Sequence, residues 1–289
     1  MKQVLVIGSE GQLGTEIKDR CTKLSDLQFT FTSLETLDVT DTQELTATIR
    51  SKAYSYIVNC TAYTAVDKAE SEQELARKIN TVAVEKIGEA AKSIGAKVIH
   101  VSTDYVFDGK NHFPYKEEAQ TSAQSVYGET KLEGEKRLLN ANPDSVIIRT
   151  SWLYSAHGNN FVKTMIRLGL ERDELGVIYD QIGTPTYAGD LADAILHIIE
   201  SDYKLQFPFT AGIYHYSNEG VASWYDFTLA ILEKMNISCK VKAIETKDYP
   251  TPAPRPHYSV LNKSKIKAVY NIEIPYWRDS LDVCLSKMK

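Results

Sequence analysis

The sequence predicts an α/β fold, a doubly wound parallel sheet followed by a smaller C-terminal lobe. Short runs rich in β-branched residues alternate with amphipathic segments of helix length through the first half of the chain. The connections between these runs are long, about a dozen residues or more, so the strands are expected to pair in parallel rather than as hairpins. A glycine-rich turn stands where the first run passes into a helical segment.

The elements follow in order along the chain. Strands are predicted at residues 4–7, 28–32, 56–60, 97–102 and 146–150. Helices are predicted at residues 12–23, 41–52, 72–93, 127–141 and 159–170. The alternation is looser after about residue 170, with short strands at 177–178, 213–217 and 241–243 and helices at 189–200, 223–235 and 277–288.

We therefore expect residues 1–150 to form the sheet domain and residues 151–289 to form mainly the smaller lobe, with some later segments crossing back. Residues 249–256 contain four of the nine prolines and cannot be the interior of a helix. An extended segment over the body of the protein is expected there.

The composition is that of an ordinary globular protein. With 289 residues, of which 43% are hydrophobic and 25% are charged, the chain can bury a sizeable core, and this argues against disorder. The net charge of −5 gives no general attraction to nucleic acid or to an anionic membrane, and neither partner is expected. The segment from Lys234 onward is basic, with 11 Lys/Arg against 5 Asp/Glu, and is either a solvated surface or an attraction for an anionic small ligand.

The cysteines indicate a reducing compartment. Cys21, Cys60, Cys239 and Cys284 have neither C-x-x-C spacing nor histidine neighbours at zinc-ligand intervals, so free thiols and no metal are expected. The apolar run at residues 4–7 is too short for a signal peptide or a membrane span, and the cytoplasm is the expected location.

The glycine-rich turn reads Gly8-Ser9-Glu10-Gly11-Gln12-Leu13-Gly14. Glycines allow a tight strand-to-helix turn and a close approach of the backbone to a ligand. A pyrophosphate can then sit at the helix N-terminus, where free N–H groups and the helix dipole favour anions. Gly8, Gly11, Gln12, Leu13 and Gly14 are therefore candidate dinucleotide-binding residues, with a plain structural turn as the alternative.

The end of the second predicted strand bears on the choice of cofactor. Thr32 and Ser33 stand there, Glu35 follows, and no arginine is present at the junction. These small hydroxyl residues tolerate a ribose phosphate, which favours NADPH with NADH also usable. Asp38 and Val39 follow, where an acid can accept a hydrogen bond from the adenine amino group; alternatively Thr40 or Asp41 caps the next helix.

The chemistry is expected at Thr103, Tyr127 and Lys131. The Tyr-x-x-x-Lys spacing places both side chains on one helical face, so the ammonium group is expected to stabilise tyrosinate and lower the pKa of Tyr127. Tyr127 would then donate a proton to a carbonyl oxygen that also receives a hydrogen bond from Thr103. The three residues predict a carbonyl reductase site.

These motifs, taken together, resemble the extended short-chain dehydrogenase/reductase superfamily, which has a Rossmann-like sheet. Within it the chain is similar to the family of dTDP-4-dehydrorhamnose reductases. The resemblance covers nearly the whole chain and includes residues 8–14, 59–70, 101–109, 149–154, 180–186 and 255–256, together with Asn80, Tyr127 and Lys131. Thr-Ala-Val-Asp-Lys-Ala-Glu at 64–70 and Ser-Thr-Asp-Tyr-Val-Phe-Asp-Gly at 102–109 point to this branch, whereas Asn59-Cys60-Thr61 departs from the usual Asn-Ala-Ala.

The resemblance implies an NADPH-dependent or NADH-dependent enzyme that reduces the 4-keto group of a dTDP-sugar, with residues 151–289 binding the sugar nucleotide. It places Lys131 also at the nicotinamide ribose. The further residues that it implies are Ala62 and Tyr63 for the cofactor, Asp104, Tyr105 and Trp152 for the sugar, and Asn160 and Arg255 for the diphosphate. Core packing for Trp152 and a helix cap for Asn160 are the structural alternatives, and a homodimer is left open.

Three other functions are weighed against the reductase. A sugar-nucleotide 4,6-dehydratase generally has Glu after the Thr-Asp pair, where this chain has Tyr105. An epimerase with bound NAD would consume no reduced nicotinamide. A non-catalytic regulatory subunit of a methionine adenosyltransferase would not need Thr103, Tyr127 and Lys131 to be intact.

Overall fold

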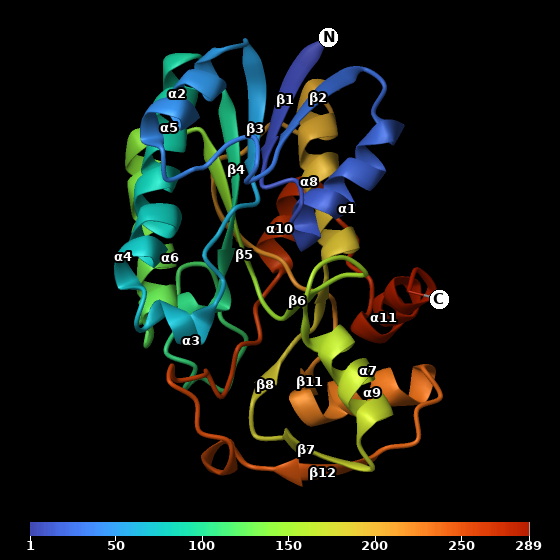
Figure 1. The fold of residues 1–289 in the computed structure, drawn as a ribbon. Helices are drawn as coiled ribbons and strands as arrows, with labels where there is room; N and C mark the ends of the chain where they lie inside the picture. The colour runs from blue at the N-terminus through green and yellow to red at the C-terminus, as the bar shows by residue number, and fades with distance from the viewer. Residues whose placement is uncertain (289) are drawn as a thin grey trace.

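The computed structural model describes residues 1–288 and has a six-stranded parallel sheet at its centre (Figure 1). The strands are β1 (Lys2–Ile7), β2 (Leu27–Thr32), β3 (Tyr54–Asn59), β4 (Lys97–Thr103), β5 (Ser145–Thr150) and β10 (Gly212–His215). Their order is β10-β5-β4-β3-β1-β2, and every neighbouring pair is parallel. The strand order reverses at β1, which creates a crevice at the carboxyl ends of β1 and β3 where ligands bind in open α/β sheets.

Helices cover both faces of the sheet (Figure 1). On one face lie α2 (Thr42–Arg50), α5 (Ala83–Ser93) and α6 (Val126–Ala141). The other face is covered by α1 (Gln12–Arg20), α8 (Ala188–Tyr203) and α10 (Ser264–Tyr270). Alternation along β1 explains the two layers, because Val4 and Val6 join one core while Leu5 and Ile7 join the other. The predicted doubly wound sheet is confirmed.

The helix expected at 72–93 is interrupted. The chain forms α4 (Gln73–Arg77), a π-helical turn (Lys78–Val82) and then α5. The turn carries Asn80, whose backbone oxygen lies so close to α6 that a Cβ on Gly134 would come within 2.0 Å of it. A periodicity argument does not detect such a local change of hydrogen-bond register.

Several short elements were not predicted. Helix α1 ends at Arg20, earlier than the predicted residue 23, and a 3₁₀ turn (Cys21–Lys23) follows it. The other additional elements are α3 (Val66–Ala69), α10 and the 3₁₀ turns at Asp104–Val106 and Thr246–Asp248. Two-residue strands pair as β6 (Leu153–Tyr154) with β9 (Thr186–Tyr187) and as β8 (Ile182–Gly183) with β11 (Ala222–Ser223). Segments of this length are too short to show a period.

The lower lobe in Figure 1 packs helices against a two-stranded sheet. Its elements are α7 (Phe161–Glu171), β7 (Glu174–Ile178), α9 (Trp224–Lys234), β12 (Lys240–Ile244) and α11 (Trp277–Ser286). Phe227, Ile231, Leu281 and neighbouring aromatic residues form its core. Helix α8 and strand β10 come later than residue 151 yet pack in the layers of the large sheet.

The proline-rich segment 249–256 contains no helix or strand, as expected. Ala253 is fully buried and its N–H donates to Asp67 Oδ1, so the segment lies against the sheet domain. The four cysteines are free, which confirms that expectation. Among the described residues, no helix is both long enough and apolar enough to cross a membrane.

Candidate active site

A cavity of about 450 Å³ opens at the carboxyl ends of β3, β4 and β5 beside the glycine-rich turn after β1. The sequence-predicted residues that line it are Gly11, Gln12, Leu13, Ala62, Thr103, Asp104, Tyr105, Tyr127, Lys131 and Trp152. Residues from the turn, from the end of β4 and from α6 are thereby brought together. Gly8, Gly14, Asp38, Val39, Tyr63, Asn160 and Arg255 lie outside this lining.

The glycine-rich turn has the shape that a pyrophosphate requires. Gly8 has φ +84°, a conformation that L side chains rarely adopt. A Cβ on Gly14 would lie 2.2 Å from the Gly8 carbonyl oxygen, so this residue lets α1 approach the strand. A Cβ on Gly11 would make only an ordinary contact, 3.5 Å from the Gly8 carbonyl oxygen, and no side chain caps α1. The N–H groups at this helix start are thus available to an anion, and the residues present fit a dinucleotide.

Asp38 and Val39 lie after β2. Asp38 Oδ1 accepts from the Thr40 N–H and hydroxyl groups at 2.8 Å each, and Val39 is buried in the core. Asp41 is the N-cap of α2 and accepts from the N–H groups of Gln43 and Glu44, as the alternative interpretation expected.

Tyr127 and Lys131 both face the cavity from α6, which begins after the Ser125 cap. Lys131 Nζ donates to the Val101 carbonyl at 2.7 Å, and burial lowers the pKa of Lys131 to about 8. Burial raises the pKa of Tyr127 to about 12, and the Thr103 hydroxyl only partly opposes this rise. The expected lowering of the Tyr127 pKa is therefore wrong for this arrangement. Desolvation of the phenol outweighs the other effects on its pKa, and Lys131 Nζ donates to a backbone carbonyl.

His100, which lies beside Lys131, was not predicted from the sequence as a site residue. Asn59 Oδ1 accepts from the backbone N–H and the hydroxyl of Thr61, so its Nδ2 points to His100 Nδ1 at 3.0 Å. The other ring nitrogen of His100, Nε2, lies 3.2 Å from Lys131 Nζ. Burial and the nearby Lys131 hold the pKa of His100 well below its usual value. The sequence signal for His100 is that a polar residue stands inside the otherwise apolar strand predicted at 97–102.

Thr103 ends β4 and caps the following 3₁₀ turn. Its hydroxyl oxygen accepts from the Tyr105 N–H at 3.2 Å, while the hydroxyl donates to Asp104 Oδ1 at 3.0 Å. Burial raises the pKa of Asp104 to about 7. The Tyr105 ring lies edge-on to Tyr127, with ring centroids 5.4 Å apart.

Trp152 lies two residues after the end of β5 and has φ +48°, a strained value for a bulky residue. Its indole stacks on Trp224 of α9, with centroids 3.5 Å apart and planes 9° apart. Trp224 Nε1 donates to Gln181 Oε1 at 3.1 Å, which fixes the second ring. Trp152 is thus held between the cavity and the lobe core. Trp224 was not among the residues predicted for the site, because its partner Trp152 is distant along the chain.

The remaining predicted residues have other contacts. The Tyr63 phenol donates to Glu72 Oε2 at 2.6 Å, and its backbone N–H donates to Asn80. Asn160 caps α7, and its Nδ2 donates to Gln12 Oε1 at 3.0 Å. Arg255 pairs with Asp67 at 2.7 Å and lines a neighbouring cavity of about 200 Å³ that Tyr105 also lines.

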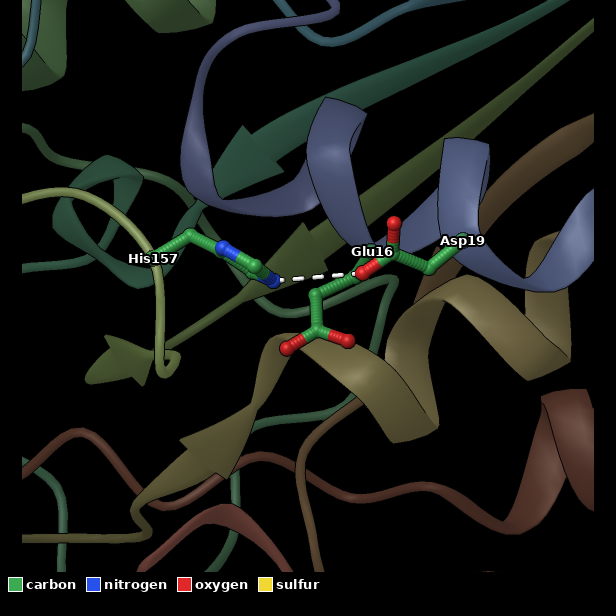
Figure 2. Close-up of side chains that lie close together, drawn as sticks. All are labelled: Glu16, Asp19 and His157. Carbon is green, nitrogen blue, oxygen red and sulfur yellow. Dashed lines mark ion pairs between the residues drawn. The ribbon is translucent and has the colours of Figure 1, made fainter. Parts of the chain in front are cut away.

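Glu16, Asp19 and His157 lie close together beside α1 (Figure 2). His157 Nε2 is 3.2 Å from Asp19 Oδ2. The buried Glu16 carboxylate accepts from Ser155 and forms ion pairs with Arg20 and Lys287. Because the protein's own cations and a hydroxyl already use the Glu16 oxygens, we propose no metal there.

Comparisons with known proteins agree with this arrangement. The family model described as RmlD substrate binding domain matches residues 1–289. The dTDP-4-dehydrorhamnose reductase of Escherichia coli K12 is 43% identical over 293 residues, which cover 99% of this chain and 97% of that protein. A crystal structure of a dTDP-4-dehydrorhamnose reductase from Clostridium acetobutylicum is 39% identical, with a TM-score of 0.93 and 99% of each chain covered.

A second solved structure is a Bacillus anthracis dTDP-4-dehydrorhamnose reductase in complex with NADP. It is 34% identical, has a TM-score of 0.93, and covers 99% of this chain and 100% of its own. A full-length family match and relatives above 30% identity over nearly the whole chain show the family. The chain therefore belongs to the RmlD family of dTDP-4-dehydrorhamnose reductases.

Proposed function

We propose that the protein is an oxidoreductase that reduces the 4-keto group of dTDP-4-dehydro-6-deoxy-L-mannose to give dTDP-L-rhamnose. One observation carries the proposal: Thr103, Tyr127 and Lys131 line the same cavity as the glycine-rich turn. A carbonyl group held there would meet a proton donor beside a dinucleotide site. Membership in the RmlD family supports the sugar nucleotide as the substrate.

The cofactor is proposed to be NADPH, with NADH also usable, and it supplies the hydride when bound. The N–H groups at the start of α1 would hold the pyrophosphate, in the turn formed by Gly8, Gly11, Gln12, Leu13 and Gly14. Ala62 and Tyr63 would flank the cofactor near its phosphates and ribose, Lys131 would bind the nicotinamide ribose, and Asp38 and Val39 would lie near the adenine. The NADP in the Bacillus anthracis relative supports NADPH.

Tyr127 is proposed to donate the proton to the C4 oxygen. With a pKa near 12 the phenol is protonated at neutral pH, which is the state that a proton donor needs. It becomes a stronger acid as negative charge develops on the substrate oxygen, and Thr103 supplies a hydrogen bond to the same oxygen. Lys131, with a pKa near 8, is mostly cationic at neutral pH and favours the tyrosinate that remains.

The sugar is proposed to contact Asp104, Tyr105 and Trp152, which all line the cavity. The diphosphate would lie toward Arg255 and Asn160, from the proline-rich segment and α7. A guanidinium suits a diphosphate because it can donate two hydrogen bonds in parallel. In this proposal residues 1–150 bind the cofactor, residues 151–289 mainly bind the substrate, and the enzyme acts in the cytoplasm.

The test offers the purified protein this keto sugar nucleotide with NADPH or NADH and follows the absorbance of the reduced cofactor. We expect net consumption of cofactor and formation of dTDP-L-rhamnose. Net consumption separates the reductase from an epimerase with bound NAD, and any turnover removes a purely regulatory role. An absence of turnover with both cofactors would contradict the proposal.

The Tyr127→Phe variant tests the proton donor, with Tyr276→Phe as the matched control because Tyr276 is half-exposed in the lobe. We expect at least a hundredfold loss of kcat in the first variant, in line with the value of general acid catalysis, and little change in the second. Full turnover by Tyr127→Phe would refute this assignment.

A further inference from the structure

Asp104 is a buried carboxyl group that belongs to no ion pair among the described residues. It is 3% exposed in the cavity wall, Oδ1 accepts from the Thr103 hydroxyl at 3.0 Å, and Oδ2 is buried without a hydrogen-bond partner. Burial raises the pKa of Asp104 to about 7, and the hydrogen bond from the Thr103 hydroxyl only partly opposes this rise. Both protonation states are therefore populated near neutral pH.

The groups around Asp104 give it no fixed counter-charge. Tyr105 in the same turn and Tyr127 on α6 face it, and both phenols are neutral because burial raises their pKa values. Two cations near the site have other partners: Lys131 Nζ donates to the Val101 carbonyl, and Arg255 pairs with Asp67. The protonation of Asp104 therefore changes the local charge without an immediate compensation.

The Thr103 hydroxyl has one hydrogen and two lone pairs. One lone pair accepts the Tyr105 N–H. When Asp104 is ionised, a charge-assisted hydrogen bond draws the Thr103 hydrogen to Oδ1. When Asp104 is protonated, its own proton can occupy the same contact, and the Thr103 hydrogen is free to turn into the cavity. The two states of Asp104 thus aim the same hydroxyl in different directions.

We propose that Asp104 is a positioning residue for the reduction: its protonated form releases the Thr103 hydroxyl to the substrate oxygen beside Tyr127, and its ionised form withdraws it. The inference rests on the proposed function. Asp104 keeps its proton through the reaction, because the hydride comes from the cofactor and the oxygen receives its proton from Tyr127. The ionised form also places a negative charge near the oxygen on which negative charge develops.

The test is the pH profile of kcat/KM for reduction of the keto sugar nucleotide by NADPH, measured from pH 5.5 to 9.5. The wild type is expected to lose activity with a midpoint near pH 7, and Lys131 adds a second decline near pH 8. Asp104→Asn replaces the carboxyl group by an amide, which cannot ionise and still donates a hydrogen bond. This variant should therefore lose the decline in activity near pH 7. The ratio of variant to wild-type kcat/KM is then expected to rise at least tenfold between pH 6 and pH 9.

The matched control is Asp108→Asn, which removes a negative charge four residues away in sequence. Asp108 bonds to Tyr115 and to the Lys110 N–H. This variant should keep the wild-type midpoint. A ratio for Asp104→Asn that stays constant with pH would overturn the proposal, whereas no wild-type turnover at any pH would overturn the proposed function instead.

A second measurement does not depend on activity. In protein labelled with ¹³C at aspartate carboxyls, the resonance missing from both Asp104→Asn and Asp104→Ser belongs to Asp104. Its chemical shift is expected to titrate with a midpoint within about one unit of pH 7, whereas the Asp108 carboxyl should titrate below the usual aspartate value. An Asp104 midpoint below pH 5 would overturn the proposal even if the variants were inactive.

Discussion

Replacing Glu135 by glutamine would leave a buried guanidinium without its counter-charge. Glu135 on α6 and Arg149 on β5 are 1% and 2% exposed, and they are joined by hydrogen bonds of 3.0, 3.2 and 2.7 Å. The Ser102 hydroxyl on β4 also donates to Glu135, so the pair ties together the elements that carry Thr103, Tyr127 and Lys131. Removing one partner of such a pair typically costs about 3–5 kcal/mol.

Urea denaturation followed by tryptophan fluorescence measures this cost. We expect the free energy of unfolding of Glu135→Gln to fall by about 3–5 kcal/mol. Glu133→Gln is the matched control on the same helix: its ion pairs with Arg77 and Arg137 are partly exposed, so its loss should stay below about 1 kcal/mol. A double variant Glu135→Leu with Arg149→Met should recover much of the stability. Equal small losses in Glu135→Gln and Glu133→Gln would refute the reasoning.

Three further predictions concern the turn, the stacked indoles and Asp104. Gly14→Ala forces a Cβ to within 2.2 Å of a backbone oxygen, so a lower Tm and weaker NADPH binding are expected. Gly11→Ala, whose Cβ meets nothing nearer than 3.5 Å, should keep its Tm and lose only cofactor affinity, and equal Tm losses would contradict this account. Trp224→Leu removes a ring stack worth about 0.5–1.5 kcal/mol, so KM for the keto sugar nucleotide should rise about 2- to 10-fold; an unchanged KM would show that Trp152 needs no such support. Because the folded-state pKa of Asp104 is raised, the contribution of Asp104 to stability should fall as pH rises from about 4 to 7. Asp104→Asn should therefore gain up to about 4 kcal/mol relative to wild type over that range, whereas a gain that is independent of pH would contradict the raised pKa.

Periodicity predicted the large sheet because its strands are long and buried on both faces. The ends of β1, β2, β4 and β5 lie within two residues of their predicted positions. The π-helical turn and the two-residue strands were missed because tertiary contacts, not local propensity, determine them. The close approach of Gly134 to the Asn80 carbonyl is such a contact.

The candidate site was predictable where its residues stand near one another in sequence, as Tyr127 and Lys131 do. The partners that set their chemistry are distant: Asn59 and His100 reach Lys131 only because β3 and β4 are neighbours in the sheet. The predicted effect of Lys131 on the Tyr127 pKa was wrong because spacing does not include the cost of burial. The sequence likewise gave no reason to expect Asp104 to titrate near neutral pH.

Hydride transfer to the sugar is the most direct test of the account. NADPH deuterated at both C4 positions of the nicotinamide ring should give dTDP-L-rhamnose with one deuterium at C4 of the sugar and none at C3 or C5, as read by NMR and mass spectrometry. A product without deuterium at C4, or recovery of unreacted keto sugar with all of the cofactor still reduced, would contradict the reductase assignment.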